Sequence, residues 1–328
     1  MAVHALRWLF GVLPMRVMRR LVLDQRGNTP LLIAGAVFVA MIVVALALHF
    51  TLKRHDHLPF DVDAAFPAEK TLVGGEVFAA TAAAVMDHEL HSGTGWRPND
   101  FFLWGPSIGP DNKASRQLGI IQAMRESVRV FKDHLTKISS NEYDPNLVAA
   151  DRLFRNDETK FWLPSAESRF DQGVEALRRY EAGLESTPPT SKPLNRRNVE
   201  VIRLFQSWSD LLGDAHGELF KEKEPDGSTV SSWDSDDYFY HSQGMAHTIF
   251  HLAKAVRREY AIDLVNRPSV TTLLNDVIDA LGKAAVMKPF IVLDGSTDGI
   301  TANHRRNIDV YIVEARQKMY SIREELEK

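Results

Sequence analysis

Hydrophobic and polar positions follow two different patterns along the chain. Residues 31–50 (LLIAGAVFVAMIVVALALHF) contain no Asp, Glu, Lys or Arg, and His49 is their only titratable side chain. A helix rises about 1.5 Å per residue, so this run can cross the ~30 Å hydrocarbon core of a bilayer. We therefore expect a single transmembrane helix over residues 30–50. The side chains expected to anchor it include Leu31, Phe38, Val43 and Leu48.

After residue 74, apolar residues recur every three or four positions, which is the spacing of one face of an amphipathic helix. Helices are predicted over 75–91, 113–138, 165–185, 195–222, 236–264, 269–287 and 305–327. The best strand candidate, residues 290–293, is too short to imply a sheet. The pattern predicts a mainly α-helical, bundle-like domain over 75–328 that a linker (51–74) joins to the transmembrane helix. Residues 186–194 (STPPTSKPL) contain three prolines and mark a connection or a subdomain boundary.

The last predicted helix carries a heptad seam. Its apolar residues Ile308, Ile312, Ala315, Met319, Ile322 and Leu326 are spaced 4-3-4-3-4. The seam could form a homodimer through the C-terminal helix or dock in the bundle. Val310 and Val313 widen the apolar stripe beyond the a and d positions of the heptad, which favours docking in the bundle.

Charge predicts the orientation in the membrane. Residues 1–29 carry five arginines (Arg7, Arg16, Arg19, Arg20 and Arg26) and one acid. The positive-inside rule then places this basic segment in the cytoplasm or at the cytoplasmic surface of a bacterial inner membrane. The main domain is expected on the other side of that membrane, in the periplasm. A cleaved signal peptide ending at Ala45-Leu46-Ala47 is the alternative, but its leader would be unusually long and the cut would fall inside the apolar run.

Composition limits the chemistry. The chain has no cysteine, which excludes disulfides, thiolate catalysis and zinc sites built on cysteine. Residues 51–328 carry 42 acidic and 34 basic side chains and no basic run, which argues against nucleic acid as a partner.

Four histidines form the best candidate metal site. His247 and His251 are four residues apart, and His88 and His91 are three apart, so each pair shares one side of a helix. Together they could bind a divalent metal ion. However, no Glu lies inside H-T-I-F-H, so the metalloprotease pattern H-E-x-x-H is missing. On a helical wheel, His247 and His251 lie opposite the apolar stripe, which favours a solvated face or a groove. We expect no cofactor, with a divalent metal as the alternative.

Other motifs are weaker. Residues 105–109 (GPSIG) match the G-x-S-x-G nucleophile pattern at Ser107, but flanking prolines and the lack of βα alternation favour a rigid turn. Residues 294–299 (DGSTDG) imitate a calcium loop, yet Arg305 occupies the position that requires a Glu ligand. Aromatic residues gather in two stretches and could form a binding surface or anchor loops to the core. The candidates for a binding surface are Trp96, Phe101, Trp104, Tyr238 and Tyr240.

Together with the apolar run, residues 95–106 (GWRPNDFFLWGP) and 236–247 (DDYFYHSQGMAH) carry a family resemblance. The chain resembles a bacterial family catalogued as domain of unknown function 2333. This resemblance implies a proteobacterial envelope protein and brings no activity, cofactor or catalytic residue with it.

These observations favour a non-catalytic function. We expect an envelope scaffold or binding protein that lies at the lipid bilayer and engages another envelope protein or a cell-wall glycan. The alternative is a membrane-tethered hydrolase with a metal ion held by the four histidines.

Overall fold

The computed structural model describes residues 29–52, 60–100, 112–136, 142–289, 292–295 and 302–328. Helix accounts for 71% of the structure and the described residues form no strand, which confirms the mainly α-helical class. The chain divides into two compact units, Met1–Arg54 and His55–Lys328. Residues 1–28 of the predicted basic, cytoplasmic or interfacial segment lie outside the described residues.

The first unit contains α3 (Thr29–Leu52), in which 24 consecutive residues are helical. The side chains of Phe38 and Val43 are 59% and 51% exposed. Leu31 and Leu48 belong to α3, but their side chains lie outside the described residues. Among the residues that the structure describes in full, no helix is both long and apolar enough to cross a membrane.

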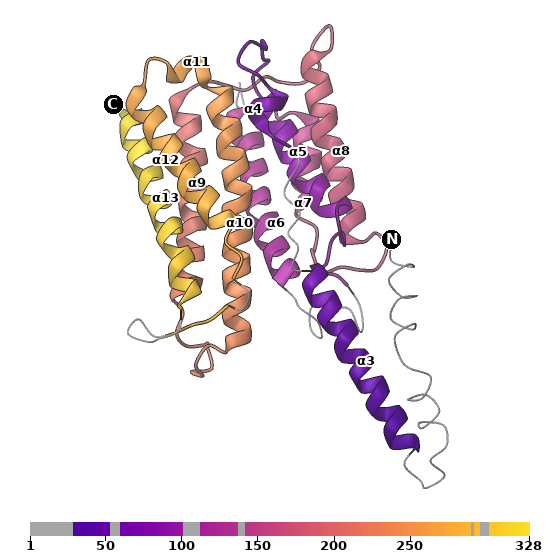
Figure 1. The fold of residues 1–328 in the computed structure, drawn as a ribbon. Helices are drawn as coiled ribbons and strands as arrows, with labels where there is room; N and C mark the ends of the chain where they lie inside the picture. Colours follow the sequence, from indigo (N-terminus) through magenta and orange to yellow (C-terminus); the bar gives the residue numbers. More distant parts are fainter. Residues whose placement is uncertain (1–28, 53–59, 101–111, 137–141, 290–291, 296–301) are drawn as a thin grey trace. The chain divides into compact units, whose positions relative to one another are not determined.

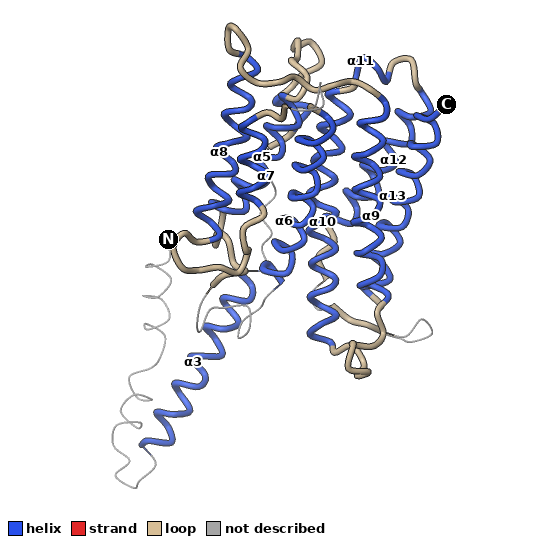
Figure 2. The backbone as a smooth tube through the Cα atoms, turned by 180° about the vertical axis from the view of Figure 1, so that it is seen from behind, coloured by secondary structure: helices blue, strands red, loops and turns tan. Residues whose placement is uncertain are grey.

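The second unit is a bundle of antiparallel helices (Figures 1 and 2). Its helices are α4 (Val62–Ala65), α5 (Glu76–His91), α6 (Asn112–Val130), α7 (Pro145–Phe154), α8 (Ala166–Glu185), α9 (Asn198–Phe220), α10 (Ser232–Glu259), α11 (Ala261–Leu264), α12 (Pro268–Ala285) and α13 (His304–Glu327). The long helix α10 packs against α5, α6, α9 and α12. Helices α5, α7 and α8 lie on one side of the unit and α9, α12 and α13 on the other, with α6 and α10 between them.

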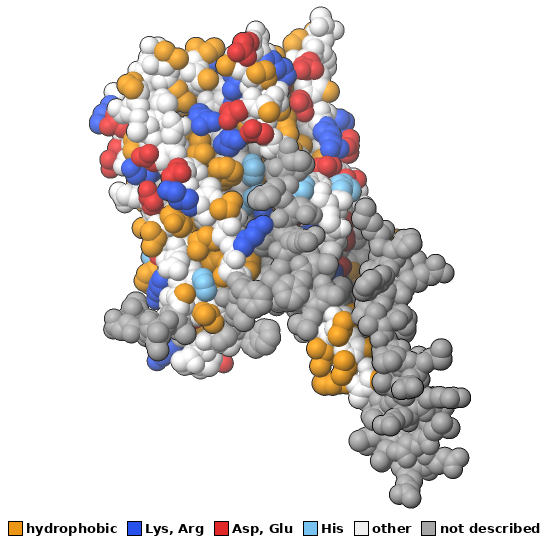
Figure 3. All heavy atoms as spheres, in the orientation of Figure 1, with side chains coloured by type: hydrophobic (Ala, Val, Ile, Leu, Met, Phe, Trp, Pro, Cys, Tyr) orange, Lys and Arg blue, Asp and Glu red, His pale blue; other side chains and the backbone are white. Residues whose placement is uncertain are grey.

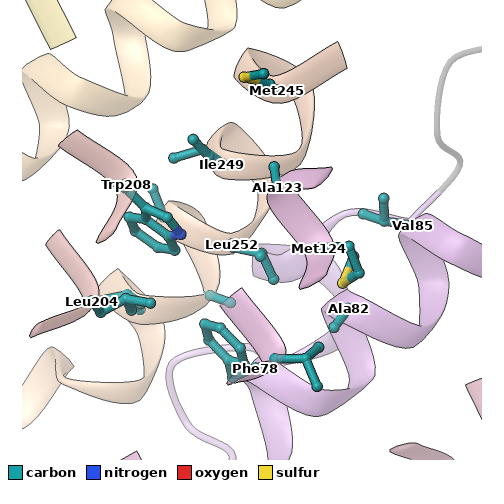
Figure 4. Packing of buried hydrophobic residues seen from close by; sticks show 14 of the residues in the cluster. Phe78, Ala82, Val85, Ala123, Met124, Leu204, Trp208, Met245, Ile249 and Leu252 are labelled. Carbon is teal, nitrogen blue, oxygen red and sulfur yellow. The ribbon is translucent and has the colours of Figure 1, made fainter. Parts of the chain in front are cut away.

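The core lies between these helices. In Figure 4, Phe78 of α5, Met124 of α6, and Ile249 and Leu252 of α10 gather around one buried region. Trp208 of α9 is fully buried, and its indole Nε1 donates a hydrogen bond to Ser127 Oγ of α6 at 2.9 Å. This bond satisfies the polar group that a buried tryptophan brings into the core.

Two glycines allow α6 and α10 to cross closely. A Cβ atom on Gly119 would lie 1.9 Å from the carbonyl oxygen of His241, and one on Gly244 would lie 1.9 Å from the carbonyl oxygen of Arg116. No real Cβ atom tolerates such a distance, so only glycine fits at either position. The close crossing brings Arg116 of α6 next to the histidine-bearing part of α10.

A buried carboxylate caps α5. Glu259, the last residue of α10, accepts hydrogen bonds from the backbone N–H groups of Gly75 (3.0 Å) and Phe78 (3.1 Å). Gly75 has a positive φ of 100°, a conformation that glycine adopts without strain. Burial raises the pKa of Glu259, although the backbone N–H groups oppose this shift. The C-terminal end of α10 thereby fixes the N-terminal end of α5.

All seven predicted helices are present, with boundaries that differ in physically clear ways. The segment predicted as 113–138 ends as an α-helix at Val130 and continues as a π-helical turn, Phe131–Leu135. The segment predicted as 236–264 breaks at Tyr260 into α10 and α11. Helix α7 was missed because its ten residues are too few for a clear period. Val292 and Leu293 form no strand.

Part of the predicted linker belongs to the packed unit. Val62 is fully buried and Phe66 is 4% exposed, so residues 60–74 are a structural element of the bundle and not a free linker. Residues 186–194 connect α8 to α9 within the same unit, where the backbone N–H of Leu194 donates to the carbonyl of Gly74 at 2.8 Å.

The heptad seam of α13 faces the chain's own bundle. Its six apolar residues, from Ile308 to Leu326, are all buried, and α13 packs against α9 and α12. The seam is therefore already covered within one chain. A homodimer through the C-terminal helix would have to use the other side of α13, where Val310 is 62% and Val313 39% exposed.

Candidate functional site

The four candidate histidines do not converge on one point. The imidazole rings of His247 and His251 on α10 are in edge contact, with centroids 4.6 Å apart, and His88 of α5 is close enough to influence the charge of His251. His91 instead lies beside Asp87 and, across on α8, Asp171, with 3.6 Å between Nε2 and Oδ1. Among the described residues, no group of three or more His, Asp or Glu side chains could hold a metal ion. The divalent metal stays a prediction from the sequence.

His251 is a neutral imidazole at neutral pH. Burial, reinforced by the positive charges of Lys254 and Arg116, lowers the pKa of His251 to about 4, and Asp61 opposes this shift only in part. His247 is 8% exposed, so the solvated face expected from the helical wheel is wrong at this position. The reason is that α5 and α6 both pack against α10, so that little of its surface is left for solvent.

A buried ion pair lies beside these histidines. Arg116 and Glu89 are each 4% exposed, and Arg116 Nη1 lies 2.8 Å from Glu89 Oε1. Burial alone would raise the pKa of Glu89, but the charge of Arg116 and hydrogen bonds from Arg116 and Gln117 hold it below its ordinary value. Gln117 also donates to the carbonyl of Gly95 (3.1 Å) and accepts from the backbone N–H of Arg97 (2.8 Å). This cluster therefore fastens the loop after α5 to α6.

The described members of the predicted aromatic surface serve as anchors. Trp96 is 3% exposed, packs edge-on against Phe170, and donates through Nε1 to the carbonyl of Glu158 at 3.0 Å. Tyr240 is 2% exposed. The hydroxyl of Tyr238 accepts a hydrogen bond from Lys221 and donates one to Glu224.

Several predicted site residues lie outside the described residues. They are Phe101 and Trp104 of the aromatic surface, Ser107 of GPSIG, and residues 296–299 of the calcium-like loop. The two described ends of that loop pair with each other: Arg305 Nη1 lies 2.8 Å from Asp294 Oδ2. The Asp294 carboxylate, which would have to bind the calcium ion, is therefore already paired with the guanidinium of Arg305.

A groove of about 590 Å³ runs between α6 and α9. Its charged lining residues are Arg125, Arg129, Arg203, Glu126, Asp210 and Asp214. Arg125 is held by Glu158 at 2.7 Å, and Arg129 by Glu126. Positive and negative side chains are equal in number, so the groove shows no preference for an anion or a cation.

The most unusual exposed feature is the loop between α7 and α8. Phe161, Trp162 and Leu163 are consecutive and are 39%, 72% and 90% exposed. The rings of Phe161 and Trp162 are in tilted contact, with centroids 4.7 Å apart and an angle of 36° between their planes. We call these three residues the apolar protrusion. Runs of exposed large apolar residues are unfavourable in water and mark interaction sites in soluble domains.

The base of the apolar protrusion is closed by hydrogen bonds. The carbonyl of Lys160 accepts from the backbone N–H of Ala166 at 2.9 Å and from Asn99 Nδ2 at 3.1 Å. Ser165 caps α8 by accepting from the backbone N–H of Ser168. These bonds tie the two ends of the protrusion together and limit the conformations of its backbone, which lowers the entropic cost of binding through it.

Sequence reasoning missed the apolar protrusion, although a signal was present. The stretch K-F-W-L-P places three large apolar residues between a lysine and a proline, in a segment with neither helical nor strand periodicity. Such residues have no element to bury them and stay at the surface unless another part of the fold covers them.

Comparison with known proteins gives a family and no activity. No curated protein and no solved structure matches the chain. One family does match, over residues 25–203 and 193–328, and is described as an uncharacterized protein conserved in bacteria (DUF2333). Because the two matches together cover nearly the whole sequence, the chain belongs to this bacterial family.

Proposed function

We propose that the chain is a membrane-anchored bacterial envelope protein that binds another envelope protein through the apolar protrusion. The apolar protrusion is the observation that carries this proposal. It presents a tryptophan, a phenylalanine and a leucine on a closed loop, and buried aromatic anchors dominate the energetics of protein interfaces.

A protein partner fits the apolar protrusion better than a cell-wall glycan does. Sugars bind on the faces of aromatic rings with polar groups around them, whereas Leu163, 90% exposed, offers only aliphatic surface. An aliphatic side chain gains most by filling an apolar pocket on a partner. On the face shown in Figure 3, basic and acidic side chains are interspersed with hydrophobic ones, and a mixed surface of this kind suits contact with another protein.

The uncharged run from Leu31 to Ala47 within α3 supports the membrane anchor, and the five arginines before it support a cytoplasmic N-terminus. The large unit would then lie in the periplasm. Alkaline extraction of bacterial membranes tests the anchor, and a periplasm-specific reporter fused after Lys328 tests the orientation. Release of the chain by alkali, or a cytoplasmic reporter, would overturn the respective part of the proposal.

Site-specific crosslinking tests the binding function. A photoreactive p-benzoylphenylalanine at Trp162 should yield a discrete protein adduct in intact cells, and Leu163→Ser should abolish that adduct. The matched control is the same group at Val310, which is 62% exposed on α13. Identical adducts from both positions, or a crosslink to glycan at Trp162, would contradict the proposal.

Metal analysis distinguishes the proposed binding function from the alternative of a metal-dependent hydrolase. A hydrolase using His88, His91, His247 and His251 would copurify with stoichiometric divalent metal and lose activity on chelation. Our proposal predicts that the adduct at Trp162 forms equally well in chelator-treated membranes.

A further inference from the structure

The groove between α6 and α9 is lined mainly by polar side chains. From α9 come Arg203, Gln206, Ser207, Asp210 and Asp214, and from α6 and the π-helical turn after it come Gln122, Arg125, Glu126, Arg129 and His134. Val130 and Leu211, both buried, supply the apolar part of the lining. The volume of about 590 Å³ falls within the ~300–1,000 Å³ range of ligand sites.

Two of the three arginines in the groove already have partners within the chain. Arg125 lies 2.7 Å from the carboxylate of Glu158. Arg129 donates two hydrogen bonds to the carboxylate of Glu126. The charges of both arginines are therefore compensated before any ligand enters the groove.

Three charged side chains of α9 have no such partner. Among the described residues, no hydrogen bond or ion pair forms to the carboxylates of Asp210 and Asp214, and both residues are exposed. Arg203 contacts Gln206 of its own helix at 3.4 Å and forms no ion pair with a described residue. The three charged residues are seven and four positions apart, so they share the side of α9 that lines the groove.

The unpaired charges are separated along the groove. At about 1.5 Å per residue, Arg203 lies about 10 Å from Asp210 and about 16 Å from Asp214 along the helix axis. The groove therefore has a positively charged end and a negatively charged end. Gln206 and Ser207 lie between the two ends, and their side chains can both donate and accept hydrogen bonds, as the N–H and C=O groups of a peptide backbone require.

We propose that this groove binds an extended peptide segment that carries a basic and an acidic side chain four positions apart. In an extended chain, two such side chains point to the same side and lie about 13 Å apart, midway between the two separations in the groove. The basic side chain pairs with Asp210 and Asp214, and the acidic one with Arg203. A small zwitterion, whose two charges are close together, cannot reach both ends. The groove is separate from the apolar protrusion and gives the chain a second means of recognising a protein.

Calorimetric titration of the full-length protein with short peptides tests this site. The probes are the acetylated and amidated peptide K-A-A-A-E and its reverse E-A-A-A-K, because an extended segment can enter the groove in either direction. At least one of them should bind, and replacing its lysine or its glutamate by glutamine should weaken binding about fivefold.

Variants of the groove assign each charge of the peptide to its partner. In Asp210→Asn/Asp214→Asn, the lysine peptide and its glutamine counterpart should bind equally, because the carboxylates that distinguish them are gone. In Arg203→Gln, the glutamate peptide and its glutamine counterpart should bind equally. Glu185→Gln, which removes an exposed acid at the end of α8, is the matched control and should keep the selectivity of the parent chain.

Three results would overturn the proposal. The first is the lack of binding of either probe at millimolar concentration. The second is equal affinity of the parent chain for the doubly charged and singly charged peptides, because the groove would then not recognise both charges. The third is binding that persists unchanged in both groove variants, because the peptide would then bind elsewhere. These titrations are independent of the crosslinking at Trp162, so the two proposals can fail separately.

Discussion

Two regions depart from the rule that charged side chains are exposed and apolar ones buried. Charged side chains are buried near the crossing of α6 and α10, and apolar side chains are exposed in the apolar protrusion. Beside the crossing, the charged residues Arg116 on α6 and Glu89 on α5 are each 4% exposed. In the apolar protrusion, Trp162 and Leu163 are 72% and 90% exposed. The buried charges compensate each other and fasten a loop, so their unusual placement is accounted for within the chain. Trp162 and Leu163 have no comparable compensation among the residues that the structure describes, and we therefore propose that they bind a partner.

The largest effect should come from closing the space at the helix crossing. Gly244→Ala places a Cβ atom against the carbonyl oxygen of Arg116, so α6 and α10 must separate. We expect a loss of about 5 kcal/mol or more in the free energy of unfolding, or no folded protein. Gly217→Ala on α9 is the control, because no atom lies within 4 Å of its added Cβ, and it should stabilise by about 0.5–1 kcal/mol. Denaturant unfolding measures both, and equal effects would contradict the close crossing.

The next effect comes from breaking the buried ion pair. Glu89→Leu leaves Arg116 charged and buried without a counterion, which should cost about 3–5 kcal/mol of unfolding free energy. The double variant Glu89→Leu/Arg116→Met should recover most of that loss, because it removes both charges. If the double variant is as unstable as the single one, the hydrogen bonds of Gln117 to Glu89 carry the stability instead.

The lowered pKa of His251 should make the stability of the folded chain depend on pH. Its pKa is about 4 in the folded chain and near 6.5 when unfolded, so the unfolded state binds more protons between these values. Stability should therefore fall as the pH drops from about 6.5 to about 4, by about 3 kcal/mol from this group. Thermal unfolding across this range should show a shallower loss for His251→Gln than for the parent chain.

The smallest effect on stability, and the sharpest contrast with the helix crossing, is expected at the apolar protrusion. Trp162→Ala combined with Leu163→Ser should change the free energy of unfolding by less than about 0.5 kcal/mol, because both side chains make few contacts. The same double variant should prevent the adduct that a photoreactive group at Phe161 forms in cells. A large loss of stability would show that the protrusion belongs to the core, against our proposal.

Helix positions were predictable because they depend on local spacing. The stripe Val201, Leu204, Phe205 and Trp208 predicts both the helix α9 and its buried face, and all four are buried. The heptad spacing of α13 likewise predicts its apolar face. It does not predict which surface covers that face, because a partner chain and the chain's own α9 and α12 satisfy the same pattern.

The candidate site was predictable only in part. The spacing of His247 and His251 places them on one side of a helix, and their rings are in contact. Their burial, the shift of the His251 pKa and the divergence of His91 toward α8 depend on where α5 and α6 lie. No local pattern contains that information.

By itself, the sequence determined the mainly helical class, the approximate ends of the seven longest helices beyond residue 74, the lack of cysteine chemistry and the bacterial family. These properties follow from composition and from intervals of three and four residues. Only the tertiary structure decided that Arg116 meets Glu89, that Glu259 caps α5, and that Trp162 is exposed while Trp96 is buried. These contacts join residues up to 184 positions apart, and they depend on which helices cover which faces. Burial is a property of the whole packed chain, so the same tryptophan side chain can anchor one loop and extend into solvent from another.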